Sequence, residues 1–186
     1  MKETDNVLRI LQETRDAIEI DNSAIIKDLS NQTINTASLT QDPDNIAVAV
    51  IVYALSKIYE RKDYRNLPGW GKANSLVKGA LDKSIMDLKK NDENKFRKDF
   101  EEIRIALEKL SGRLKDYVAD VFRKAQVNKA SRLYEHGISM ESTAKLLGVT
   151  MFELAEYAGQ TGISEVHGTQ TMDVKQRIKI AEGMFK

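Results

Sequence analysis

Residues 42–59 read Asp-Pro-Asp-Asn-Ile-Ala-Val-Ala-Val-Ile-Val-Tyr-Ala-Leu-Ser-Lys-Ile-Tyr, and this stretch decides the fold. Asp42 is a suitable helix N-cap, Pro43 fits the first helical position, and Asp44 complements the positive end of a helix. The ten apolar residues 46–55 could form a buried strand, but their three alanines and this start signal favour a helix. Because such a helix is apolar on every side, neighbouring helices or a second subunit must surround it. We expect it to be the central helix of an N-terminal bundle, with a dimer interface as the alternative.

The sequence before this helix predicts two more helices. The apolar residues of 3–20 fall near one helical face, and a second, short helix is expected over 23–29. Residues 30–42 are rich in Ser, Thr and Asn and predict a loop. Together, residues 1–66 form the first expected domain, an N-terminal helical region.

The composition is that of an ordinary folded protein. The chain has 186 residues, of which 41% are hydrophobic and 31% are charged, and it contains no cysteine. The lack of cysteine excludes a disulfide framework, a thiolate metal site and a cysteine nucleophile. No apolar run reaches about 18 residues, and the first residues show no signal-peptide pattern. We therefore expect a cytoplasmic protein that does not enter a membrane.

The charge is unevenly distributed along the chain. The formal net charge is +1, but residues 67–136 carry 16 basic and 11 acidic residues, a net of +5. This excess is compatible with a stripe that faces phosphates, although a solvated helix face is the more common origin of such charge.

Residues 67–126 are expected to form a long antiparallel helical hairpin. Its first helix begins near Trp70, which we expect to anchor the core. Beyond the tip at 89–94, apolar residues recur with a period of 3.5 over more than three heptads. These residues are Phe96, Phe100, Ile103, Leu107, Leu110, Leu114, Tyr117 and Val121. The pair Ser111-Gly112 interrupts the pattern and could bend or end the helix.

The most specific pattern lies within residues 129–162 and reads Ala144-x-x-Leu147-Gly148-Val149-Thr150-x-x-x-Leu154. Ala144 is small where two helices would cross, Gly148 suits a turn with a positive φ, and Thr150 can cap the next helix. The pattern predicts a helix-turn-helix. The expected third domain, residues 127–186, contains it together with a tail helix that begins near Asp173.

Residues 129–160 resemble the helix-turn-helix proteins that occur as antitoxin-like partners and transcriptional regulators in bacteria and archaea. The residues that carry the resemblance are Leu133, Tyr134, Gly137, Ile138, Ser139, Met140, Ala144, Leu146, Leu147, Gly148, Val149, Glu153 and Leu154. The resemblance covers less than a fifth of the chain. It implies binding of duplex DNA with autoregulation, or pairing with a toxin.

Two kinds of side chain could serve a DNA-binding role here. Phosphate contacts are expected from Lys129, Arg132 and Lys145. The second helix of the motif would present Thr150, Met151, Glu153 and Tyr157 to the bases. This helix has two glutamates and no basic residue, which is a poor match for a groove lined by phosphates.

Two other functions therefore remain open. An adaptor would hold a protein partner, such as a toxin or a ribosome or polymerase component, through Met151, Phe152 and Tyr157. A binder of structured RNA or the ribosome would use the basic stretch 89–124. Salt dependence separates phosphate binding from an apolar protein contact.

The sequence gives little support for catalysis. The two histidines, His136 and His167, are far apart, and no metalloprotease motif, phosphate-binding loop or nucleophile elbow is present. We expect no enzyme activity, no metal and no cofactor. We expect an all-α, non-enzymatic DNA-binding regulator that forms a homo-oligomer through residues 46–59 or through the hairpin.

Overall fold

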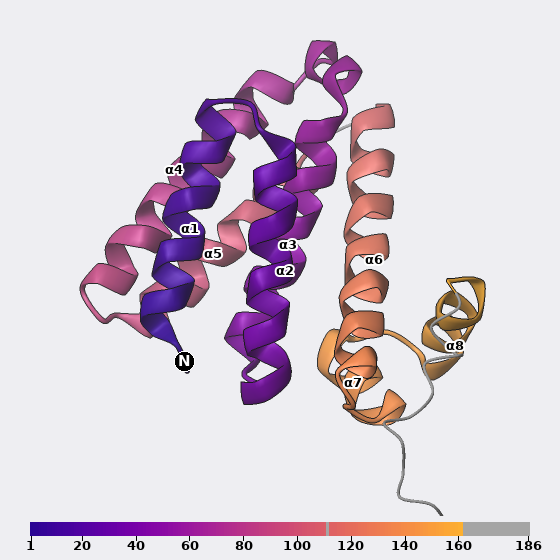
Figure 1. Ribbon diagram of the computed structural model, residues 1–186. Coiled ribbons are helices and arrows are strands. Elements are labelled where there is room, and N and C mark those ends of the chain that lie inside the picture. The colour runs from indigo at the N-terminus through magenta and orange to yellow at the C-terminus, as the bar shows by residue number, and fades with distance from the viewer. Residues whose placement is uncertain (111, 162–186) are drawn as a thin grey trace, which may run out of the picture.

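The computed structural model describes residues 1–110 and 112–161, and this part of the chain is helical and contains no strand (Figure 1). The expectation of an all-α fold is confirmed. The helices are α1 (Thr4–Glu19), α2 (Ser23–Thr40), α3 (Pro43–Glu60), the 3-10 helix η1 (Lys62–Asn66), α4 (Trp70–Lys89), α5 (Glu93–Glu108), α6 (Gly112–Glu135), α7 (Met140–Leu147) and α8 (Met151–Gln160).

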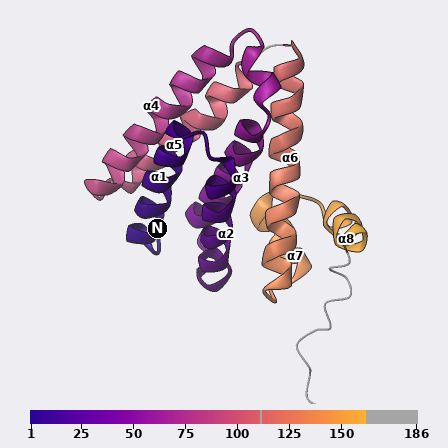
Figure 2. The ribbon, with the colours of Figure 1, turned by 45° about the horizontal axis from the view of Figure 1, so that its top comes forward.

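Helix α3 lies at the centre, as its sequence predicts. The Asp42 carboxylate accepts hydrogen bonds from the backbone N–H groups of Asp44 (2.9 Å) and Asn45 (3.4 Å), and Pro43 occupies the first turn. Both views place α3 between α2 and α6 (Figures 1 and 2). None of the large apolar side chains of α3 is exposed. Helices of the same chain therefore cover α3, and its burial does not require a second subunit.

Helix α2 corrects the prediction of a loop over residues 30–42. The helix continues to Thr40 because its polar side chains find partners within the fold. The Ser30 hydroxyl donates to the Ala49 carbonyl of α3 at 2.7 Å, and the Thr33 hydroxyl donates to the Leu29 carbonyl at 2.9 Å. Buried Ile26, Leu29, Ile34 and Ala37 give the helix an inward face, and this packing against α3 outweighs a weak helix propensity.

The region 67–126 differs from the predicted hairpin in its second half. Helix α5 turns back along α4, but it ends at Glu108, and Gly112, with φ of 59°, begins a new helix. Helix α6 then packs against α3 rather than against α4 (Figure 2). The apolar residues of the predicted repeat are buried except for Tyr117, which is half-buried. The repeat therefore continues through two helices that have different partners.

Trp70 is buried at the first residue of α4, as expected. Its ring meets the Tyr59 ring edge to face, with 5.5 Å between centroids and 72° between planes. This contact fixes the start of α4 against the end of α3.

Helix α6 runs without a break through the expected domain boundary at 126/127 and connects the central bundle to α7 and α8. Among the described helices, α3 included, none combines the length and the apolar run that a membrane-spanning segment needs. The tail helix expected from Asp173, and His167, lie outside the described residues.

Candidate functional site

Helices α7 and α8 form a compact pair at the end of α6 (Figure 1). Gly148 follows α7 with φ of 64° and ψ of 29°, a left-handed conformation that favours glycine. Leu147, Val149 and Leu154 fill the space between the helices and α6. The expected roles of Gly148 in the turn and of Leu154 in the core are confirmed.

The start of α8 is fixed by a reciprocal pair of hydrogen bonds. The Thr150 hydroxyl accepts from the Glu153 N–H at 3.1 Å, and the Glu153 carboxylate accepts from the Thr150 N–H at 2.9 Å. The Arg123 guanidinium of α6 donates to the same carboxylate at 3.0 Å and to the Gly148 carbonyl at 3.3 Å. The Thr150 hydrogen bonds, with Arg123 beside them, lower the pKa of Glu153 to about 2. Glu153 is therefore ionised and ties α8 to α6.

Two large apolar side chains project into solvent beside this cap. Met151 is 54% exposed and Phe152 is 78% exposed. The next turn adds exposed Ala155 and Glu156 to the same end of α8. We call Met151, Phe152, Ala155 and Glu156 the α8 surface.

Lys129 is not on the surface, and the expectation that it contacts phosphates is wrong in this respect. Its side chain is fully buried between α6, α2 and α3, where its ammonium donates to Asn31 Oδ1 at 2.9 Å. The ammonium also lies 4.5 Å from the centre of the Tyr53 ring. Burial, with a smaller effect from the charges of Arg132 and Lys27, lowers the pKa of Lys129 to about 7.

Of the other candidate residues, two lie on the surface and one packs between α8 and α6. Arg132 is exposed and pairs with Glu135 at 2.8 Å, and Lys145 is exposed on α7. Tyr157 is half-buried, and its hydroxyl accepts from the Asn128 amide at 3.0 Å. Tyr157 therefore faces α6 rather than an incoming ligand.

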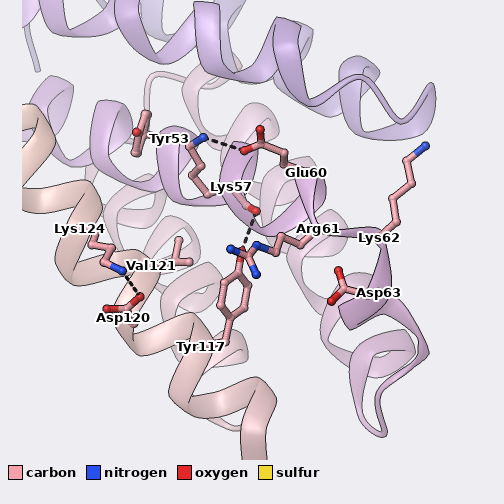
Figure 3. A pocket seen from close by; sticks show the side chains of 10 residues that line it. All are labelled: Tyr53, Lys57, Glu60, Arg61, Lys62, Asp63, Tyr117, Asp120, Val121 and Lys124. Carbon is pink, nitrogen blue, oxygen red and sulfur yellow. Dashed lines mark hydrogen bonds and ion pairs between the residues drawn. The ribbon is translucent and has the colours of Figure 1, made fainter.

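A concave site that sequence reasoning missed lies beside the first half of α6. This groove has a volume of about 650 Å³ and lies between the end of α3, the start of η1 and α6. Its side chains, shown in Figure 3, are Tyr53, Lys57, Glu60, Arg61, Lys62, Asp63, Tyr117, Asp120, Val121 and Lys124. We call it the α3–α6 groove.

Aromatic rings organise one wall of the α3–α6 groove. Tyr64 and Tyr117 are stacked with 4.1 Å between centroids and 5° between planes. The Tyr117 hydroxyl donates to the Lys57 carbonyl at 2.9 Å and so joins α6 to the last turn of α3. Burial raises the pKa of Tyr117 to about 12, so its hydroxyl keeps its proton at neutral pH.

The Arg61 guanidinium lies beside these rings, 5.5 Å from the centroid of Tyr117 and 5.9 Å from that of Tyr64 (Figure 3). Within residues 1–110 and 112–161, Arg61 makes no ion pair or hydrogen bond, so its N–H donors are available to a ligand.

The sequence carried only a partial signal for these features. Continuing the buried positions Val118, Val121 and Ala125 of α6 leads to Lys129 and then Leu133, which could have indicated an inward-facing lysine. The groove had no comparable signal, because its residues come from segments about 60 positions apart that only the packing of α6 on α3 brings together.

The described residues contain no group of three His, Asp or Glu side chains that could hold a metal ion. His136 Nε2 lies 3.1 Å from Asn35 Oδ1, a contact between α6 and α2 rather than part of a catalytic group. The two features that could meet a partner or ligand are the α8 surface and the α3–α6 groove. No family model, no curated protein and no solved structure matches this chain.

Proposed function

We propose that this chain is a non-enzymatic adaptor whose α7–α8 pair, a helix-turn-helix, binds a protein partner through the α8 surface. The observation that carries the proposal is the exposure of Met151 and Phe152 next to each other at the start of α8. Methionine and aromatic residues are enriched in protein interfaces, and adjacent exposed apolar groups of this size favour a partner that covers them.

The charge of the module supports a protein partner over duplex DNA. Residues 137–161 contain one basic residue, Lys145, and three acidic residues, Glu141, Glu153 and Glu156. A helix that enters a groove of DNA must approach phosphates, which repel ionised glutamates. Of the three residues expected to contact phosphates, Lys129 is buried, Arg132 is paired with Glu135, and Lys145 is exposed. Arg123, beside the start of α8, is paired with Glu153. The partner surface should therefore have an apolar pocket with a basic rim.

Binding of duplex DNA as an antitoxin-like regulator is the second candidate, and one observation favours it. A concavity of about 340 Å³ between α5 and α6 is lined by Lys115, by Arg104, which pairs with Glu101, and by Arg123, which pairs with Glu153. It adjoins the start of α8, because Arg123 also contacts Gly148 and Glu153. Phosphates could lie along this concavity while α7 and α8 contact the duplex.

Site-specific cross-linking tests the first candidate. A photo-reactive amino acid at position 152 of the full chain, expressed in its native host, should cross-link to one protein, and the product should survive nuclease and high salt. The same probe at exposed Lys89 of α4 is the matched control and should not give that product. Phe152→Glu should reduce co-purification of the partner at least tenfold, about 1.4 kcal/mol or more.

The regulator predicts a different result from the same material. Enrichment of one short duplex sequence, with affinity that falls steeply with salt, would contradict the adaptor. The double substitution Arg132→Ala/Lys145→Ala would then lower the affinity and its salt slope, whereas the adaptor requires it to leave partner binding unchanged.

A further inference from the structure

The α3–α6 groove is separate from the α8 surface and combines three chemical features in one place. It has an arginine with free donors, aromatic rings, and carboxylates at its edge. A volume of about 650 Å³ is in the range of sites for small molecules.

The charges of the groove leave Arg61 as its available cation. Lys57 pairs with Glu60 at 2.7 Å, and Lys124 pairs with Asp120 at 2.7 Å (Figure 3). Lys62 points away from these pairs and lies 3.7 Å from Asp21 outside the groove. The seven charged side chains of the lining, four basic and three acidic, have a net charge of +1. Because the two lysine pairs are neutral, Arg61, Lys62 and Asp63 carry the remaining net charge of +1.

Arg61 is an exposed side chain that lies against aromatic rings. Its guanidinium rests beside two stacked tyrosines, and the Tyr117 hydrogen bond to Lys57 holds those rings against the end of α3. A planar arginine held in this way presents parallel N–H donors, which match the oxygens of a phosphate group.

We propose that the α3–α6 groove binds a phosphate monoester of the nucleotide class, with its phosphate on Arg61. Tyr53, which is half-buried at the other end of the lining, offers its ring to the base. A ligand with both a ring and a phosphate explains why the lining has aromatic residues and an arginine together.

Calorimetric titration of the full chain at low salt tests this site. The probes are adenosine monophosphate, uridine monophosphate, inorganic phosphate and adenosine. We expect the monophosphates to bind, inorganic phosphate to compete with them more weakly, and adenosine to bind at least about tenfold more weakly than its monophosphate.

Four variants locate the site. Arg61→Ala should weaken nucleotide binding at least about tenfold, and Arg61→Lys, which keeps the charge but loses the planar donors, should fall between it and the wild type. Tyr53→Leu should weaken nucleotide binding but not phosphate binding. Lys89→Ala removes an exposed charge on α4 and should change neither affinity. Circular dichroism checks that each variant is folded. If Arg61→Ala does not fold, Arg61→Lys still tests the role of the guanidinium.

A 5′-phosphorylated oligonucleotide distinguishes a free nucleotide from the end of a nucleic acid strand as the ligand. Binding tighter than the mononucleotide would identify the end of a nucleic acid strand as the ligand, and weaker binding would identify a free nucleotide. Three results would overturn the proposal: no saturable binding up to about 10 mM, equal affinity for adenosine and its monophosphate, or full affinity in both Arg61 variants.

Discussion

Helices α3 and α8 both carry large apolar side chains, but the fold covers one set and leaves part of the other in solvent. Val48, Val52 and Leu55 of α3 are fully buried, whereas Met151 and Phe152 of α8 are 54% and 78% exposed. The two helices begin in the same way, with a side-chain cap and an acidic residue in the first turn. Local sequence therefore fixes where each helix starts, and the neighbours decide whether its apolar residues build the core or remain available to a partner.

The same contrast holds for two lysines of α6. Lys124 is exposed and paired with Asp120. Lys129 is buried, and it contacts the Asn31 amide oxygen and the Tyr53 ring. One lysine adds solubility, and the other imposes a desolvation cost on the folded state.

Removing an apolar side chain from α3 should give the largest effect. Leu55→Ala leaves a cavity in the most covered helix, and we expect it to lower the free energy of unfolding by about 2–5 kcal/mol. Urea unfolding followed by circular dichroism measures the change. Leu39→Ala, at a leucine that is 88% exposed on α2, is the control and should alter stability by less than about 0.5 kcal/mol. If the two variants lost similar amounts of unfolding free energy, burial would not explain the difference between Leu55 and Leu39.

Lys129→Met should change how stability depends on pH. In the wild type, the pKa of Lys129 is about 7 in the folded chain and near its ordinary value of 10.5 after unfolding. Between these values the unfolded chain binds more protons, so the free energy of unfolding should rise with pH, by at most about 1.4 kcal/mol per pH unit. The methionine variant lacks this contribution and should be more stable than the wild type near pH 7, because no amine is desolvated.

Urea unfolding at several pH values from 7 to about 9, below the range where tyrosines titrate, measures this slope. Lys124→Met removes an exposed amine from the same helix and should keep the wild-type slope. A Lys129→Met variant with an unchanged slope would mean that the buried ammonium does not control the pH dependence.

Thr150→Ala should have a moderate effect at the start of α8. Loss of the cap should cost about 1 kcal/mol of stability, and Thr150→Ser should restore most of it. Because the Thr150 hydrogen bonds are the main cause of the low pKa of Glu153, that pKa should rise from about 2 toward its ordinary range. Titration of the Glu153 carboxyl signal by NMR measures it. An unchanged pKa in the alanine variant would assign the effect to the backbone N–H of residue 150, which alanine keeps, and to Arg123.

Phe152→Ala should have the smallest effect on stability, less than about 0.5 kcal/mol, because the ring is already in solvent. Thermal unfolding of the isolated protein measures this change. The same substitution should weaken partner binding clearly, and this combination distinguishes a binding residue from a core residue. A loss of stability above about 1 kcal/mol would place Phe152 in the core and contradict the α8 surface.

Patterns that depend on neighbouring residues could be predicted from the sequence. The Asp42-Pro43 start of α3, the left-handed Gly148 and the Thr150 cap are confirmed, and each depends only on residues within one turn. The burial of Trp70 at the start of α4 agrees with the prediction that this residue anchors the core.

Features that depend on distant packing could not be predicted in this way. The Ser and Thr residues of 30–40 suggested a loop, but Ser30 bonds to Ala49 of a helix that the local sequence does not contain. Lys129 looked like a surface residue because its partners, Asn31 and Tyr53, lie far away in the chain. The α3–α6 groove exists only where two helices and a 3-10 turn meet.

Helix α6 sets a fixed distance and rotation between the α3–α6 groove and the α8 surface. It has 24 residues, about 36 Å of continuous helix, and it contributes Tyr117 to the groove and Arg123 to the anchoring of α8. One residue inserted between these positions would turn one surface relative to the other by about 100° and shift it by about 1.5 Å. The number of residues in α6 therefore sets the angle between the α3–α6 groove and the α8 surface.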